Sequence, residues 1–208
     1  MKLILSRNDL WQGIDTVLEA VPGKPAMPIL ANILMVADAE GLCLTTTDLD
    51  LSIRTRVPAQ VDREGAVGVP ARMLAEIARE WPDATLNLEV TDTSLHLEGQ
   101  VGGKAGGQGR YSLAGVAPDE FPVFPEQLLG TTLDLADTEG LTAATIAEMI
   151  QRTAFAVSRE DTRPVLNGAL WRVDQEGMLL VATDAHRFAH FRVPVDVEVA
   201  AVGQRGRR

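Results

Sequence analysis

Asp184, His186 and His190 are the residues whose types and spacing most directly suggest chemistry. Alternation along a β-strand would place His186, Phe188 and His190 on one face, where they could bind a metal ion with Asp184. A metal-dependent hydrolase also needs a base and a further ligand, and the sequence has no H-E-x-x-H pattern or suitably placed glutamate. No serine or cysteine forms a recognisable motif with the histidines. We therefore predict a non-catalytic protein without a metal or other cofactor, and keep the metal site as the weaker alternative.

The glycine-rich segment VGGKAGGQGR, residues 101–110, is a second candidate, for phosphate binding. It lacks the pattern GxxxxGK[ST], and it precedes a strand-like run instead of opening a helix. We interpret it as a hairpin loop. His96 lies between Leu95 and Leu97 in an alternating run, so we expect its side chain to face solvent.

Composition narrows the class of protein. The formal net charge of −10 argues against binding nucleic acid by bulk attraction, but it leaves open basic residues confined to one surface. The first apolar run, residues 3–5, is too short for a signal peptide or a membrane span, so we predict no membrane association. The single cysteine, Cys43, rules out an internal disulfide and indicates a reducing cytoplasm. Its setting, GLCLTT, predicts a small buried hydrophobic side chain.

The elements that must position these residues occur twice. Residues 28–48 align without a gap on residues 164–184, at an offset of 136 positions. Nine of the 21 aligned positions are identical: Pro28/Pro164, Leu30/Leu166, Leu34/Leu170, Asp38/Asp174, Glu40/Glu176, Gly41/Gly177, Leu44/Leu180, Thr47/Thr183 and Asp48/Asp184. Such a repeat indicates a duplicated structural unit, in which the shared residues belong to the fold and the differing residues carry function. We expect Asp48 to cap its turn through the neighbouring backbone.

The first copy reads as a mixture of helices and antiparallel strands. Apolar spacing predicts a helix capped by Ser6 or Asn8, with an inward stripe at Leu10, Ile14, Val17, Leu18 and Val21. A second helix over 69–81 has its stripe at Leu74, Ile77, Ala78 and Trp81. Alternating or β-rich runs predict strands at 1–6, 32–38, 42–48, 49–57, 86–90, 94–99 and 110–115, with one short strand before the second helix.

The proline-rich segment 116–130 is interpreted as the connection between two domains, 1–125 and 126–208. The second copy is predicted to repeat a strand at 131–136 and a helix over 139–156, with Leu141, Ile146, Met149 and Ile150 inward. We expect its helix and β-meander to be separated by about four more residues than in the first copy. Arg208 stands opposite Arg72, so we expect only the N-terminal part of a second domain, of marginal stability.

Six short segments occur in this order: KPAMPIL, TTTDLDL, VPARML, DEFP, DTRPVLNG and VATDAHRFA. Through these segments the chain resembles the bacterial DNA polymerase III β subunit, the sliding clamp. The resemblance runs from Met1 to about residue 198. It implies an α+β DNA-clamp fold, in which each domain packs two helices on antiparallel sheets. In that family three such domains per chain form a homodimeric ring of six around duplex DNA, without reading its sequence. The protein would be a cytoplasmic, non-catalytic processivity factor of the replicative polymerase.

The resemblance also implies a hydrophobic pocket for short linear motifs of the polymerase, the clamp loader and repair polymerases. In the family, one wall of this pocket comes from the matching motifs, and the opposite wall comes from a third domain that is not expected here. Ala185 stands where the family usually has glycine. The residues carried over are Arg163, Leu166, Thr183, Ala185, His186, Arg187 and Phe188.

For DNA contact, the resemblance and the placement of basic residues nominate Lys24, Arg72, Arg79, Arg152 and Arg159. Pro164 and Val165 stand where the family often has aromatic residues, which weakens any stacking contact from that loop. Because this form is expected to lack the third domain, we predict that by itself it does not close a ring. The remaining alternative is therefore a shortened, clamp-like regulator that binds partner peptides without encircling DNA.

Overall fold

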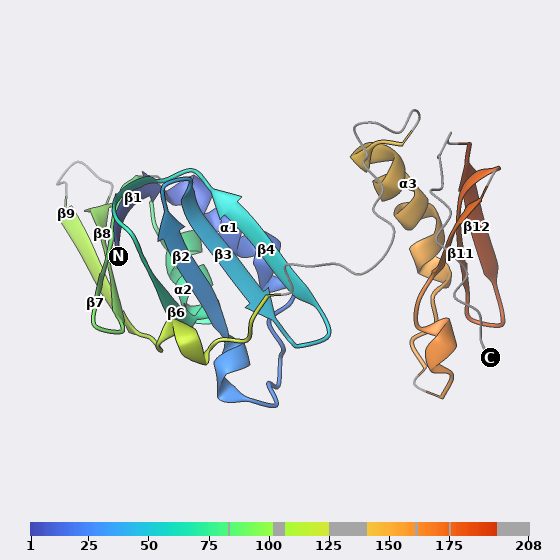
Figure 1. Cartoon of the computed structure of the whole chain (residues 1–208), viewed down its shortest axis with the longest axis horizontal. Coiled ribbons are helices and arrows are strands. Elements are labelled where there is room, and N and C mark those ends of the chain that lie inside the picture. Colours follow the sequence, from blue (N-terminus) through green and yellow to red (C-terminus); the bar gives the residue numbers. More distant parts are fainter. Residues whose placement is uncertain (83, 102–106, 125–140, 161, 175, 195–208) are drawn as a thin grey trace, which may run out of the picture. The chain divides into compact units, whose positions relative to one another are not determined.

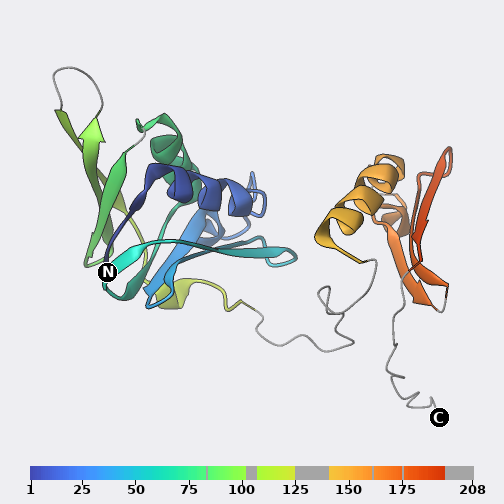
Figure 2. The ribbon, with the colours of Figure 1, turned by 90° about the horizontal axis from the view of Figure 1, so that it is seen from above.

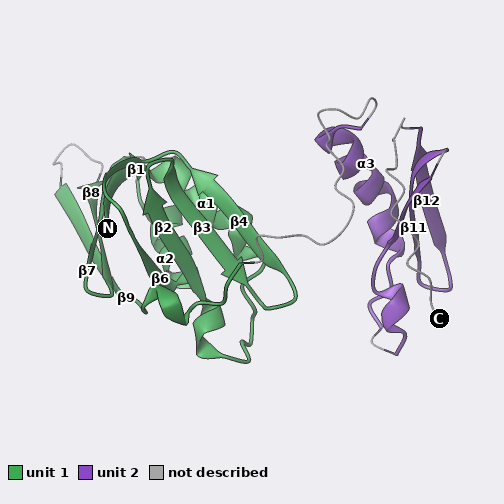
Figure 3. Cartoon of the chain, in the orientation of Figure 1, with its two compact units in different colours: residues 1–126 green, residues 127–208 purple. Residues whose placement is uncertain are grey.

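The computed structural model describes residues 1–82, 84–101, 107–124, 141–160, 162–174 and 176–194 (Figure 1). The chain divides into two compact units, residues 1–126 and 127–208 (Figure 3). The predicted strand at 131–136 lies outside the described residues. Within the described ranges, no helix has both the length and the apolar character needed to cross a membrane.

Unit 1 contains two antiparallel sheets. The strands of the five-stranded sheet run in the order β5 (Gln60–Arg63), β1 (Lys2–Ser6), β7 (Thr85–Thr91), β8 (Ser94–Val101) and β9 (Gly107–Ala114). The four-stranded sheet has the order β4 (Ser52–Val57), β3 (Gly41–Thr47), β2 (Asn32–Asp38) and β6 (Gly65–Pro70). Helices α1 (Arg7–Leu18) and α2 (Ala71–Glu80) pack against each other and on the four-stranded sheet (Figures 1 and 2).

One continuous hydrophobic core joins both helices to both sheets. The Ser6 hydroxyl caps α1 by accepting the N–H of Asp9 at 3.0 Å, as the sequence predicted. The predicted stripes are confirmed where α1 buries Leu10, Ile14 and Val17 and where α2 buries Leu74 and Ala78, while Leu18 and Ile77 are half-buried. Val21 and Trp81 are also buried, although each lies just past the end of its helix. The prediction for Cys43 is also confirmed, since its side chain is buried in β3.

The sequence predicted one short strand before the second helix, and the structure has two. β5 is a polar strand that lies at the edge of the five-stranded sheet and pairs with β1, so it has no apolar face to reveal it in the sequence. β9 begins at Gly107, inside the segment interpreted as a loop, and pairs with β8 from Gly107 onward. Residues 102–106 of that loop lie outside the described ranges.

Unit 2 contains helix α3 (Ala143–Thr153) and a three-stranded meander, β10 (Leu170–Asp174), β11 (Gly177–Thr183) and β12 (Phe188–Val193). Its small core consists of Leu141 and Met149, which the sequence predicted to face inward, and of Met178 and Leu180 from β11. Ile146 packs on this core and is half-buried. The inward prediction for Ile150 is wrong, since this side chain is 44% exposed.

The described part of unit 2 also contains two 3₁₀ turns, η3 (Ala154–Ala156) after the helix and η4 (Pro164–Leu166) before the meander. The duplication is visible in the element bounds: β11 and β12 begin and end 136 positions after β3 and β4. Helix α3 begins 136 positions after α1, and η4 begins 136 positions after η1 (Pro28–Ala31). The expectation of a loop about four residues longer is therefore wrong.

Candidate partner-binding site

The turn between β11 and β12 is held by side-chain hydrogen bonds within its own sequence. The Thr183 hydroxyl donates to the Arg187 carbonyl at 2.7 Å and accepts the N–H of Ala185 at 3.2 Å. Asp184 Oδ1 accepts the backbone N–H groups of His186 and Arg187 at 3.0 and 2.9 Å. Asp184 Oδ2 accepts Nε of Arg187 at 2.8 Å. These bonds fix the turn before any partner arrives. We call residues 183–188 the unit 2 turn.

The Asp184 carboxylate is committed to this turn. The backbone N–H of Arg187 lowers the pKa of Asp184 most strongly, and the N–H of His186 and the Arg187 guanidinium act in the same direction. Ionised Asp184 thus serves the backbone and Arg187. Among the described residues, no group of three His, Cys, Asp or Glu side chains is arranged to hold a metal ion.

The expected alternation of His186, Phe188 and His190 on one strand face is wrong at its first member. His186 lies in the turn, and β12 begins only at Phe188. Phe188 and His190 do share a face, with ring centroids 5.7 Å apart. Both side chains are exposed, so this face offers an aromatic surface rather than a set of ligands.

Ala185 has a left-handed backbone, with φ of 74°. A side chain in this region costs roughly 1–2 kcal/mol, whereas glycine adopts it freely. The turn geometry thus gives a backbone reason for the glycine that the resemblance led us to expect here. The added methyl group is exposed and is compatible with the hydrogen bonds of the unit 2 turn.

The structure brings five of the seven nominated peptide-site residues together in the unit 2 turn. Of the other two, Leu166 ends η4 and Arg163 directly precedes it. Arg163 is exposed and its carbonyl accepts the N–H of Leu166 at 2.9 Å. Leu166 is half-buried, and its own carbonyl accepts the N–H of Ser158 at 2.9 Å. Between the residues described, no hydrogen bond or ion pair joins η4 to the unit 2 turn. η4 and the unit 2 turn are thus held by separate sets of hydrogen bonds.

Phe155 is a further residue at this turn, and the sequence did not suggest a role for it. The Arg187 guanidinium carbon lies 5.8 Å from the centroid of the Phe155 ring. Phe155 belongs to η3 and is 58% exposed. The only signal in the sequence was an aromatic residue at the end of a helix, and nothing in its spacing connects it with Arg187.

Exposed apolar side chains are frequent in unit 2. They include Phe155, Val165, Leu170, Trp171 and Phe188. Leu170 pairs with Val181 across the sheet, and Val181 pairs with His190, so the three side chains form a row on the face that also carries Phe188. Exposed apolar surface of this kind is typical of binding surfaces.

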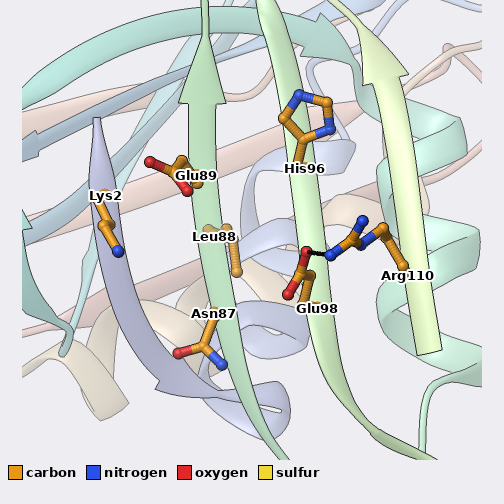
Figure 4. A pocket seen from close by; sticks show the side chains of 7 residues that line it. All are labelled: Lys2, Asn87, Leu88, Glu89, His96, Glu98 and Arg110. Atoms are coloured by element: carbon orange, nitrogen blue, oxygen red, sulfur yellow. Dashed lines mark ion pairs between the residues drawn. The ribbon is translucent and has the colours of Figure 1, made fainter. Parts of the chain in front are cut away.

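The surface hollow drawn in Figure 4 has a different character. It has a volume of about 380 Å³ and lies on the five-stranded sheet of unit 1. Its lining is largely polar, and the Arg110 guanidinium and the Glu98 carboxylate lie 2.6 Å apart across it. His96 is half-buried in this lining, so the expectation that it simply faces solvent is only partly right. Paired charges of this kind do not make a pocket for apolar anchors.

The candidate DNA-binding residues of unit 1 differ in whether their side chains already have hydrogen-bond acceptors within the protein. Lys24 is exposed in the loop after α1. Arg72, at the start of α2, donates Nη2 to the carbonyl of Val21 at 3.2 Å and so ties α2 to the beginning of the same loop. Arg79 donates Nε to Glu80 at 3.0 Å. Lys24 is thus presented outward, while both arginines already have acceptors.

The candidate DNA-binding residues of unit 2 also include one side chain with an acceptor within the protein and one that is exposed without one among the described residues. Arg152 pairs with Glu148 one helical turn earlier at 2.8 Å, and its guanidinium carbon lies 5.3 Å from the Phe191 ring centroid. Arg159 is exposed in the loop after η3. We found no hydrogen bond or ion pair between its guanidinium and the other described residues. Among the nominated DNA candidates of unit 2, Arg159 is therefore more available to phosphate than Arg152.

The duplicated unit, with helices on antiparallel sheets, defines the DNA-clamp fold, and comparison with known proteins gives the family. The model of the "DNA polymerase III beta subunit, N-terminal domain" matches residues 1–125, and the model of the "central domain" matches residues 140–202. The chain belongs to the DNA polymerase III beta subunit family.

Individual relatives agree with the family models. The beta sliding clamp of Synechococcus elongatus is 36% identical over 192 residues, which cover 91% of this chain and 48% of that protein. The beta sliding clamp of Bacillus subtilis is 29% identical, covering 95% of this chain and 51% of the relative. A crystal structure of the Pseudomonas aeruginosa sliding clamp bound to griselimycin superimposes with a TM-score of 0.82 at 28% identity, over 95% of this chain and 50% of that one. The chain thus spans about half the length of these relatives.

Proposed function

We propose that this chain acts as part of a sliding clamp, a non-catalytic processivity factor that holds a bacterial replicative DNA polymerase on duplex DNA. The observation that carries this proposal is the fold match: two copies of one α+β unit superimpose on sliding clamps over 95% of the chain. The same match supports assembly into a closed homodimeric ring together with the further segments that the relatives contain.

Holding DNA by enclosure explains how a chain with a net charge of −10 can serve on DNA. A ring needs only weak, sequence-blind contacts with phosphates, because topology prevents dissociation. Lys24 and Arg159 are exposed cations suited to such contacts. Arg72 contributes by anchoring the loop of Lys24 through the Val21 carbonyl.

We further propose that client proteins dock on the unit 2 turn and the aromatic face beside it. Exposed Phe188 would contact the apolar anchors of a short peptide, and His186 and Arg187 would bind its carbonyl groups or a terminal carboxylate. The rigid turn favours binding because little conformational entropy is lost when a peptide arrives.

Peptide docking is tested by titrating the protein into a fluorescein-labelled pentapeptide with leucine and phenylalanine anchors and a free C-terminal carboxylate. Fluorescence anisotropy should give saturable binding that Phe188→Ala weakens at least about tenfold, the effect of a modest hot spot. The control Leu51→Ala removes an exposed side chain of similar size from the corresponding turn of unit 1 and should bind like the wild type. Equal affinity of Phe188→Ala and the wild type would reject this site.

Enclosure of DNA is tested separately, with this chain joined to the further segments that the relatives contain and assembled by a clamp loader on nicked circular DNA. Gel filtration should show protein that stays with the circle and is lost when a restriction enzyme linearises it. Protein that binds the peptide yet never remains on circular DNA would instead identify a peptide-binding regulator.

A further inference from the structure

We propose that Phe155 is a positioning residue of the peptide site, whose ring holds the Arg187 guanidinium at the rim of the unit 2 turn. A partner carboxylate would then meet an arginine that is already in place. This inference rests on the proposed peptide docking and adds to it a residue that touches the partner only through Arg187.

The backbone of Phe155 is fixed by its neighbour. Ala156 is fully buried and packs with Ala182 and Ala189 in a small cluster beneath η3. Ala182 directly precedes the unit 2 turn, and Ala189 directly follows it. Because the residue next to Phe155 is anchored on both strands that enter the turn, Phe155 is held beside the turn although its own side chain is largely exposed.

Arg187 is held at two points. Its Nε donates to Asp184 at 2.8 Å, and its guanidinium carbon lies 5.8 Å from the Phe155 ring centroid, within the range of a cation–π contact. The Arg187 side chain remains 57% exposed. A guanidinium has five N–H donors, so the donors that Asp184 does not use can still meet a partner carboxylate.

The first copy of the unit lacks this pair. At the offset of 136 positions, Phe155 corresponds to Glu19 and Arg187 corresponds to Leu51. The anchor is nevertheless shared, because Ala20 is as deeply buried as Ala156. Both members of the pair therefore differ between the copies while the buried alanine beside them is kept, which is the pattern expected of a feature added to a common fold.

The physical consequence is a lower entropic cost of binding. A free arginine side chain loses conformational entropy when a partner fixes it. An aromatic ring beside an exposed guanidinium contributes about 0.5–1 kcal/mol, which corresponds to about two- to fivefold in affinity. We expect the contribution of Phe155 to peptide binding to be of this size.

The test compares Phe155→Leu and Phe155→Tyr in the anisotropy titration with the carboxylate-ended pentapeptide. Leucine keeps an apolar side chain but has no ring, so the affinity should fall about two- to fivefold. Tyrosine keeps the ring and should bind within about twofold of the wild type. Tyr111→Leu is the matched control, since Tyr111 is 50% exposed and lies in unit 1. It should leave peptide binding unchanged.

Two further measurements separate positioning from direct contact. In an Arg187→Gln background, Phe155→Leu should cause no additional loss, because the group that it positions is gone. With an amidated C-terminus on the pentapeptide, the effect of Phe155→Leu should also disappear. An equal loss in either case would mean that Phe155 contacts the peptide itself and would overturn the positioning role.

The outcomes also distinguish this inference from the proposed function. If the wild-type protein does not bind the pentapeptide, the proposed docking site fails. If the wild type binds and Phe155→Leu binds equally well, the docking site stands and the role of Phe155 is rejected. Circular dichroism of each variant establishes that unit 2 is still folded when its affinity is measured.

Discussion

The turn of unit 1 at residues 47–52 and the unit 2 turn share their hydrogen bonds between side chains and backbone. Thr47 donates to the carbonyl four residues later at 3.0 Å, as Thr183 does at 2.7 Å. In each turn the following aspartate accepts the N–H groups two and three residues after it. The third residue is left-handed in both, with φ of 83° at Leu49 and 74° at Ala185.

The side chains on these two backbones have opposite character. The unit 1 turn presents exposed Leu49, Asp50 and Leu51, which are apolar and acidic. The unit 2 turn presents His186 and Arg187 at the corresponding last two positions. A threonine and an aspartate therefore specify the turn, and the outward residues are free to differ. The comparison teaches that structure and binding chemistry are encoded by different residues of the same six-residue segment.

The other ends of β3 and β11, where they follow β2 and β10, are also stabilised alike in the two units. The Arg56 guanidinium pairs with Asp38, and Arg192 pairs with Asp174 at 3.0 Å. The N–H of the residue two positions after each aspartate donates to the carboxylate at 2.9 Å in both units. Glycines with positive φ, Gly41 at 126° and Gly177 at 117°, follow in the same place. The whole β-hairpin is thus a repeated unit with variable surface residues.

Exchanging the outward residues gives the largest expected effect. A variant in which residues 185–188 become Leu-Asp-Leu-Ser keeps Thr183 and Asp184, and therefore the turn. It removes the aromatic anchor and the cationic rim together, so peptide affinity should fall at least about 100-fold in the anisotropy titration. The loss of stability should stay within about 1 kcal/mol, measured by urea unfolding. A variant that unfolds instead would show that these side chains also maintain the fold.

A glycine substitution examines the shared backbone. A Cβ at Gly41 would lie 2.7 Å from the Val57 carbonyl oxygen, and the positive φ adds strain of about 1–3 kcal/mol. Gly41→Ala should therefore lower the free energy of unfolding by about 2 kcal/mol or more, measured by urea denaturation. Gly23→Ala is the control, since a Cβ there meets nothing within 4 Å. Wild-type stability of Gly41→Ala would contradict the assigned hairpin geometry.

Regular spacing made much of this fold predictable. The apolar period of α1, the Ser6 cap and the alternation along β7 and β8 each express a local preference that the chain carries in its own sequence. The repeat itself was visible because the hairpin depends on residue types, an aspartate and a glycine, that few alternatives can replace. Asp48 was expected to cap its turn, and its two backbone bonds confirm this.

The features that could not be predicted from the sequence depend on packing between segments that are distant in the chain. Ile14 is fully buried because α2 packs on α1, whereas the corresponding Ile150 is 44% exposed on the only α-helix in the described part of unit 2. A helical period marks both residues alike. The contact of Phe155 with Arg187 joins residues 32 positions apart, and no local pattern encodes such a pair.

Replacing Ala185, whose backbone is left-handed, by glycine should change stability by a smaller amount than Gly41→Ala and in the opposite direction. Ala185→Gly relieves backbone strain of about 1–2 kcal/mol, and the greater freedom of glycine in the unfolded chain offsets part of this gain. The free energy of unfolding should rise by about 0.5 kcal/mol in urea denaturation, and Leu49→Gly should behave alike in unit 1. Peptide affinity of Ala185→Gly should remain within about twofold. A destabilised glycine variant would show that the methyl group has a packing role.

Lowering the pH should destabilise both hairpins together, and this is the smallest of the expected effects. The Arg56 guanidinium, followed by the N–H of Glu40, lowers the pKa of Asp38 below its usual value of 3.8, and Arg192 acts first on Asp174 in the same way. A carboxyl whose pKa is lowered by folding stabilises the native state above about pH 3.8 and loses this contribution as the pH falls through its folded pKa. The hydrogen-exchange protection factors of the two hairpins, corrected for the intrinsic exchange rate at each pH, should therefore fall in parallel below about pH 3.8. Asp38→Asn should flatten that pH dependence only in unit 1. Asp92→Asn controls for the removal of one charge elsewhere. If Asp38→Asn altered both hairpins equally, the two units would not be independent copies of one design.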